Sequence, residues 1–152
     1  GEIESNLRKQ HRNQTRGIKP RVYLGSKHDG ILKMYVNACE FEVGFLEVVG
    51  SPTKVDVKGY YEDLEKLFKA MQISIYFQRC HHLNRNAMEE KLSWIQSFGV
   101  LVYQRKTTIY VMHRSKGGLN LVDVLATFTI PESADQAYVL EEIIKKVYFF
   151  KV

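Results

Sequence analysis

Glu47 is the charged residue whose position most needs a chemical explanation. It belongs to a β-rich run at residues 41–49, and alternate residues of a strand share one face. The face that carries Glu47 is otherwise apolar, with Phe41, Val43, Phe45 and Val49. A carboxylate that points this way is costly to bury unless it is ion-paired, hydrogen-bonded or bound to a metal ion. The purely structural explanation would be pairing with a nearby lysine at a sheet edge.

Asp29 stands at the head of the preceding β-rich run, residues 29–36. Four residues separate this run from the one that holds Glu47, so the two runs should form an antiparallel hairpin. Asp29 and Gly30 are also a common turn pair, which explains an aspartate here without any chemistry. Taken together, in this order and followed by a helix, the two acids form a candidate functional site.

This arrangement resembles the core of the PD-(D/E)xK nuclease superfamily. The superfamily's aspartate falls on Asp29, in the segment KHDGIL, and its glutamate falls on Glu47, in the segment FLEVVG. The resemblance implies that both acids are catalytic and that they bind one or two Mg²⁺ ions. The metal would polarise the scissile phosphate and lower the pKa of an attacking water. Glu2 or Glu4 would represent the further acid that often comes from the preceding helix.

The superfamily also places a lysine two residues after the glutamate, where this chain has Val49. Some members take this lysine from elsewhere. Lys33 shares a strand face with Asp29 but lies four strand residues away, or about 13 Å, so its side chain would have to fold back. Lys54 and Lys58 follow the hairpin closely and are the other candidates. The missing lysine favours binding of nucleic acid over cleavage.

Basic residues are concentrated before the predicted hairpin. Residues 1–27 hold seven Lys or Arg and two Glu, a surplus of five that equals the net charge of the whole chain. The seven are Arg8, Lys9, Arg12, Arg16, Lys19, Arg21 and Lys27. Cationic side chains that neutralise phosphates release counterions whatever the base sequence, so this basic arm predicts non-specific binding to a nucleic-acid backbone. A solvated helix face is the alternative.

The order of elements predicts one domain at residues 21–152, after a basic arm or weak helix at residues 1–20. A short strand is expected at residues 21–24, before the hairpin. Apolar residues then recur with helical spacing from Val57 to Ile75, which is the clearest amphipathic helix in the chain. With the resemblance, this order implies an α+β fold with mixed α/β layering: a restriction-endonuclease-like core whose central mixed sheet of five or six strands is flanked by helices.

The second half of the chain predicts another helix, a meander and a terminal helix. The helix should span residues 85–96, with Asn84 as its N-cap. Strands are expected at residues 99–104, 107–114 and 119–130, and their short connections indicate an antiparallel meander. Ser133 should cap the terminal helix. The apolar residues of that helix should face inward, namely Ala137, Leu140, Ile144, Val147 and Tyr148.

Composition excludes several classes of protein. The chain has 152 residues, 45% of them hydrophobic, yet no apolar run approaches the roughly 20 residues that span a bilayer. The start shows no hydrophobic signal region, so an intracellular protein, nuclear or cytoplasmic, is expected. Cys39 and Cys80 fit no metal-ligand spacing and are expected to be reduced. No Walker loop, GxSxG elbow, HExxH helix or GxGxxG loop occurs.

These observations favour a nuclease-like domain, inactive or weakly active, that acts in nucleic-acid binding or protein assembly. An active Mg²⁺-dependent DNA or RNA endonuclease that uses Asp29 and Glu47 is the first alternative. An effector or protein-interaction domain that self-associates is the second. Its contact surface would use the exposed members of an aromatic set, namely Tyr103, Tyr110, Tyr148, Phe149 and Phe150.

Overall fold

A computed structural model describes residues 3–5, 27–36, 38–85, 87–136 and 138–150. Most of the basic arm lies outside these residues, as does the strand expected at residues 21–24. At the start of the chain, β1 (Ile3–Glu4) pairs antiparallel with β2 (Lys27–His28). These first residues therefore form a short strand and not the weak helix that the sequence predicts.

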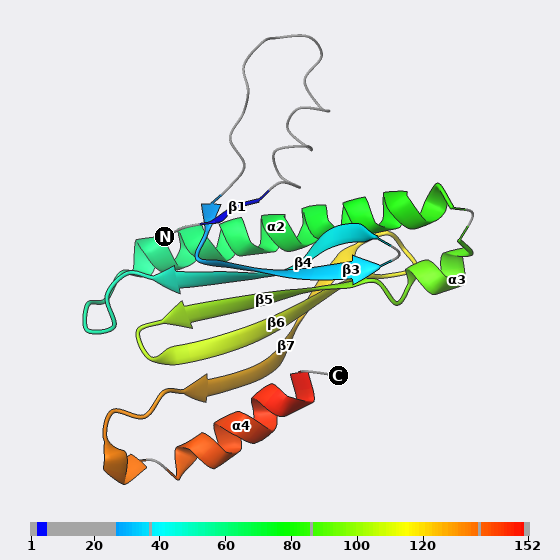
Figure 1. Ribbon diagram of the computed structural model, residues 1–152. Coiled ribbons are helices and arrows are strands. Elements are labelled where there is room, and N and C mark those ends of the chain that lie inside the picture. The colour runs from blue at the N-terminus through cyan, green and yellow to red at the C-terminus, as the bar shows by residue number, and fades with distance from the viewer. Residues whose placement is uncertain (1–2, 6–26, 37, 86, 137, 151–152) are drawn as a thin grey trace.

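Five strands form one mixed sheet in the order β3-β4-β5-β6-β7 (Figure 1). The hairpin consists of β3 (Gly30–Val36) and β4 (Cys39–Val49). The meander consists of β5 (Gln96–Tyr103), β6 (Lys106–Arg114) and β7 (Asn120–Thr129). The hairpin and meander are joined where β4 and β5 pair in parallel. Both predicted motifs are confirmed, and the fold is α+β with a five-stranded mixed sheet.

The long helix α2 (Val57–Leu83) covers one face of the sheet and packs on β4, β5 and β6 (Figure 1). Parallel neighbours need a crossover connection, and α2 provides it between β4 and β5. Gly99 lets the two layers approach, because a Cβ at this position would lie 2.6 Å from Met71 Sδ. The buried cluster between helix and sheet includes Phe45, Val49, Leu67, Met71, Ile75, Leu101 and Tyr110.

The beginning of α2 is tied to the ends of both parallel strands. Gly50, with φ of 55°, ends β4 in a backbone conformation that side chains with a Cβ rarely adopt. Asp56 is the N-cap, and its Oδ1 accepts a hydrogen bond from the Gly59 backbone at 2.8 Å. The backbone N–H of Asp56 in turn donates to Tyr103 Oη at the end of β5, at 3.2 Å. These contacts fix the end of the sheet that holds Glu47.

The helix predicted at residues 85–96 is wrong. Only one turn forms there, α3 (Glu89–Leu92), because α2 continues well beyond Ile75. Asn84 caps the C-terminus of α2, and its backbone N–H donates to the Cys80 carbonyl at 3.1 Å. A polar residue between two apolar stretches can close one helix as readily as open another.

The terminal helix exists as α4 (Val139–Phe150), after a 3-10 turn at Ala134–Gln136, but its predicted inward face is wrong. Its apolar residues are exposed, by 65% in the case of Ile144. The others are Leu140, Val147 and Tyr148, and Ala137 lies outside the described residues. In Figure 1, α4 lies beyond β7, where Lys146 Nζ donates to the Thr127 carbonyl at 3.1 Å. None of the described helices combines the length and apolarity needed to cross a membrane.

Candidate functional site

Glu47 lies near the end of β4 and points toward α2, on the same side as Phe45 and Val49. Its side chain is only 2% exposed. Both carboxylate oxygens have a partner: Oε2 accepts from Lys66 Nζ at 2.7 Å, and Oε1 contacts His28 Nδ1. An ion pair and a second hydrogen bond therefore account for the burial of this charge.

Asp29 precedes β3 and lies beside the chain segment that holds Glu47. Its Oδ2 accepts a hydrogen bond from the Val48 N–H at 2.7 Å, and its own N–H donates to the Leu46 carbonyl at 3.1 Å. These two bonds bracket Glu47 in the sequence. The hairpin brings the two acids to the same end of the sheet, with Asp29 exposed and Glu47 buried.

The helix α2 adds Asp63 and Lys66, which lie about one turn apart on the helix. Burial raises the pKa of Asp63, and the negative charges of Glu47 and Asp29 raise this pKa further, while Lys66 lowers it. Asp63 is thus close enough to interact electrostatically with both hairpin acids. Three carboxylates and one ammonium group therefore interact electrostatically near the end of β4.

His28, at the end of β2, is fully buried beneath this group. Its ring centroid lies 5.0 Å from that of Phe45. Within the described part of the chain, its Nε2 has no hydrogen-bond partner, whereas Nδ1 contacts Glu47. A neutral ring with its proton on Nδ1 donates to the carboxylate and leaves only an acceptor lone pair unpaired. His28 therefore helps to fix the orientation of Glu47.

Position 49, where the resemblance expects a lysine, belongs to the core. Val49 is 2% exposed and packs in the same cluster as Phe45 and Leu101. Lys66 reaches Glu47 from the helix instead, and its side chain is 25% exposed. A lysine amine is therefore present at the glutamate, but a different element supplies it.

The other predicted lysines have different neighbours. Lys33 pairs with Glu40 at 2.7 Å, toward the turn of the hairpin. Lys58 pairs with a glutamate on the next turn of α2, and Lys54 is exposed in the loop before that helix. Lys27 is exposed in β2, while the rest of the basic arm lies outside the described residues.

The chemistry of the donors fits a hard divalent cation. Carboxylate oxygens from Asp29, Glu47 and Asp63 are the ligand type that Mg²⁺ and Mn²⁺ prefer. In the ranges that the structure describes, no three His, Cys, Asp or Glu side chains are already arranged to hold a metal ion. Lys66 and His28 already contact both oxygens of Glu47, so a cation at Glu47 would have to share an oxygen with one of these side chains or displace it. The Glu2 and Glu4 side chains lie outside the described part.

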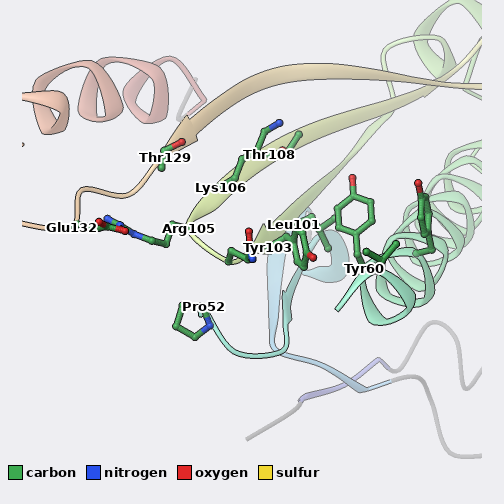
Figure 2. Close-up of a pocket in the computed structure, with 12 residues that line it drawn as sticks. Pro52, Tyr60, Leu101, Tyr103, Arg105, Lys106, Thr108, Thr129 and Glu132 are labelled. Atoms are coloured by element: carbon green, nitrogen blue, oxygen red, sulfur yellow. The ribbon is translucent and has the colours of Figure 1, made fainter. Parts of the chain in front are cut away.

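A pocket of about 590 Å³ opens at the same end of the sheet (Figure 2). Its walls come from the β4–α2 loop, the first turns of α2, the β5–β6 turn and the segment after β7. They carry aromatic and cationic side chains, including Tyr60, Tyr61, Tyr103, Arg105 and Lys106. Leu101 lines the pocket and is the register partner of Glu47 on the neighbouring parallel strand. Adjacent strands lie about 4.8 Å apart. Leu101 therefore places this wall of the pocket one strand from Glu47, although the acids themselves are not among the described residues that line it.

The described aromatic residues considered for self-association have different environments. Tyr103 lines the pocket, and Tyr148 is exposed on α4. Tyr110 is not available for such a surface, because it is 8% exposed and packs edge-to-face on Phe68. The side chains of residues 149 and 150 lie outside the described part.

Three residues of the site were not predicted from the sequence: His28, Asp63 and Lys66. Asp63 and Lys66 are spaced to share one side of the helix that follows the Glu47 strand, which is a visible signal. That spacing does not predict, however, that the helix packs on β4. His28 precedes Asp29 where the superfamily has proline, and no periodicity indicates that it is buried.

Comparison with protein-family models, with curated proteins and with solved structures gives no match to this chain. The resemblance to the nuclease superfamily therefore stays a prediction. The residues of the site and their geometry are the basis on which a function can be proposed.

Proposed function

We propose that this is a nuclease-like domain that binds nucleic acid and hydrolyses it slowly with Mg²⁺ or Mn²⁺. Asp29, Glu47 and Asp63 would hold the ion, and Lys66 would replace the lysine that is missing at position 49. The observation that carries the proposal is the 2.7 Å contact between Lys66 Nζ and Glu47 Oε2. This contact answers the main argument against cleavage, which is the valine at position 49.

Each residue has a role that follows from its chemistry. A bound divalent ion supplies Lewis acidity at the phosphate and lowers the pKa of a water. The exposed carboxylate of Asp29 is accessible to an incoming cation, while Glu47 provides a fixed charge beneath it. Lys66 has three N–H donors, so it can keep its bond to Glu47 and also donate to a phosphate oxygen. Its positive charge would favour the negative charge that develops there.

The basic arm is proposed to bind the phosphate backbone of the substrate. Lys27 directly precedes His28 and Asp29 and is exposed, so a phosphate that it binds would lie next to the acids. Lys and Arg contacts of this kind position a strand without reading its bases. Affinity should therefore fall steeply as salt rises.

Binding without cleavage is the second candidate, and the burial of Glu47 favours it. The side chain is 2% exposed and both oxygens are already engaged. If Lys66 and His28 always keep their contacts with the Glu47 carboxylate, the site is degenerate, because two side chains take the place of the metal ion. This burial is also the reason to expect slow rather than efficient hydrolysis.

Cleavage assays on single-stranded and double-stranded DNA and RNA distinguish the two candidates. Wild type should cleave at least one substrate with Mn²⁺ or Mg²⁺ and none in EDTA. Glu47→Gln and Lys66→Met should each lower the rate about 100-fold or more. Lys69→Met, which removes an exposed lysine from the same helix, is the matched control and should cleave like wild type.

Two outcomes contradict the proposal of cleavage. Retained binding with no metal-dependent cleavage by wild type would select the binding candidate. Cleavage by Glu47→Gln at the rate of wild type would show that Glu47 is not a ligand.

A further inference from the structure

The pocket at this end of the sheet has an aromatic wall that hydrolysis itself does not require. The rings of Tyr60 and Tyr61 meet edge-to-face with centroids 5.2 Å apart, and those of Tyr60 and Tyr103 lie 5.1 Å apart. Tyr61 is 63% exposed, so much of its ring is free for a ligand. Tyr60 contacts Tyr61 and is itself packed against Tyr103, so one neighbouring ring limits the movement of Tyr61. The result is a preformed surface for a flat ring.

The opposite wall is cationic. Arg105 is held by an ion pair with Glu132 and by a hydrogen bond to the Ile130 carbonyl (Figure 2). Lys106, on the same turn, is exposed and makes no ion pair within the described part of the chain. The lining therefore carries two positive charges against one negative charge. An anionic group on the ligand would meet Lys106.

The turn that presents these cations has an unusual backbone. Gln104 has φ of 57°, a left-handed conformation that costs a residue with a Cβ about 1 to 2 kcal/mol. This conformation closes the two-residue turn between Tyr103 and Lys106. Two-residue hairpin turns need such a residue, so this conformation fixes the positions of Arg105 and Lys106 at the edge of the pocket.

We infer that this pocket binds one unpaired nucleotide of a single-stranded nucleic acid, with its base on Tyr61 and a phosphate at Lys106. The inference rests on the proposed function and names its substrate class. Aromatic side chains stack on any base, and lysine neutralises phosphate, so an aromatic wall opposite a free lysine suits a nucleotide. The volume of about 590 Å³ lies within the usual range of small-ligand pockets.

The position of the pocket links it to the acids. Leu101 lines it and pairs in register with Glu47, so a nucleotide held there is one strand away from the strand of Glu47. The neighbouring phosphate of the same strand would then reach the acids. In a duplex the bases are stacked and paired, so the pocket selects single strands.

Binding is measured by fluorescence anisotropy in EDTA, where the proposed cleavage cannot occur, with a labelled single-stranded DNA dodecamer. Tyr61→Ala should weaken binding about tenfold, which corresponds to about 1.4 kcal/mol. Tyr61→Phe keeps the ring and should bind like wild type. Tyr138→Ala removes a tyrosine that is 77% exposed outside the pocket and should have no effect.

A second pair of variants tests the phosphate contact. Lys106→Gln should weaken binding and reduce the salt slope by about one. Lys91→Gln, an exposed lysine on α3, is the matched control and should leave the slope unchanged.

A second probe separates stacking from charge. A dodecamer of abasic sites carries the same phosphates, and wild type should bind it about as weakly as Tyr61→Ala binds normal DNA. Equal affinity of wild type and Tyr61→Ala, or equal affinity of wild type for both probes, would overturn the inference. The cleavage assays with Glu47→Gln need metal and these assays exclude it. If affinity does not depend on Tyr61 or on the bases while cleavage still depends on Glu47, only the nucleotide pocket is rejected. If affinity depends on both but no Glu47-dependent cleavage occurs, only the proposed hydrolysis is rejected.

Discussion

Lys66 on α2 and Glu47 on β4 form an ion pair of 2.7 Å across the packed layers of the domain. Glu47 is almost completely buried, whereas a quarter of Lys66 is exposed. The pair therefore fixes the helix on the sheet and leaves the ammonium group within reach of solvent. It contributes to the stability of the fold as well as to the proposed site.

A double-mutant cycle in EDTA should reveal this contribution. Lys66→Met should destabilise the protein by about 1 to 3 kcal/mol, because the buried Glu47 carboxylate loses its charged partner. In the Glu47→Gln background, Lys66→Met should lower the free energy of unfolding much less, because no buried carboxylate is left without its charged partner. Urea denaturation of the four proteins measures the coupling. Costs that add within about 0.5 kcal/mol would mean that the two groups do not interact.

Divalent cations should stabilise the folded protein if the carboxylates bind them. A ligand at 100 times its Kd stabilises the native state by about 2.7 kcal/mol, so Mn²⁺ should raise Tm above its value in EDTA. Asp29→Asn should abolish most of this rise. Asp123→Asn, which removes an exposed carboxylate from β7, is the control and should keep the full rise in Tm. A rise that persists in Asp29→Asn would place the bound ion elsewhere.

The close approach of α2 to the sheet predicts a large difference between two glycines. Gly99→Ala should destabilise the protein by about 1 to 3 kcal/mol, because the new Cβ would lie 2.6 Å from Met71 Sδ and 3.0 Å from Leu67. Gly117→Ala places its Cβ no closer than 3.8 Å to Ser115 Oγ. Its effect should stay within about 0.5 kcal/mol. Thermal unfolding of both variants checks this, and similar losses would contradict the packing described.

Tyr110 should make stability depend on pH in the alkaline range. Burial, and then a hydrogen bond with Tyr60, raise the pKa of Tyr110 to about 12, compared with 10 for an ordinary tyrosine. Because the folded state binds this proton more tightly, the contribution is present below about pH 10 and is lost as pH rises toward 12. Tyr110→Phe should lose less stability than wild type between pH 9 and 12. Urea denaturation across this range measures the difference, with Tyr138→Phe as the exposed control.

Local pattern was sufficient to predict most of the elements. The alternation on β4 placed Glu47 on the face with Phe45 and Val49, and the helical spacing from Val57 to Ile75 identified α2. Both results depend on the periods of strands and helices, which are properties of the chain alone. The same reasoning failed for α4, because the spacing of apolar residues predicts a helix but does not predict which part of the structure, if any, covers its apolar face. The exposure of Ile144 illustrates that difference.

The candidate site was predictable only in part. Asp29 and Glu47 are adjacent because one hairpin carries both. Lys66 became visible only when α2 was placed over β4, since the contact depends on packing between layers. Position 49, two residues after Glu47, belongs to the core and therefore holds an apolar residue, Val49.

The acids and the cations of the pocket belong to different parts of the chain. His28 and Asp29 lie just before β3, Glu47 lies in β4, and Asp63 and Lys66 lie in the first turns of α2. The cations of the pocket, Arg105 and Lys106, lie at the β5–β6 turn. The turn can therefore change in length or charge without displacing a single acid. If the proposed function is right, exchanging residues 104–106 should change which nucleic acid the domain binds and leave the acids in place.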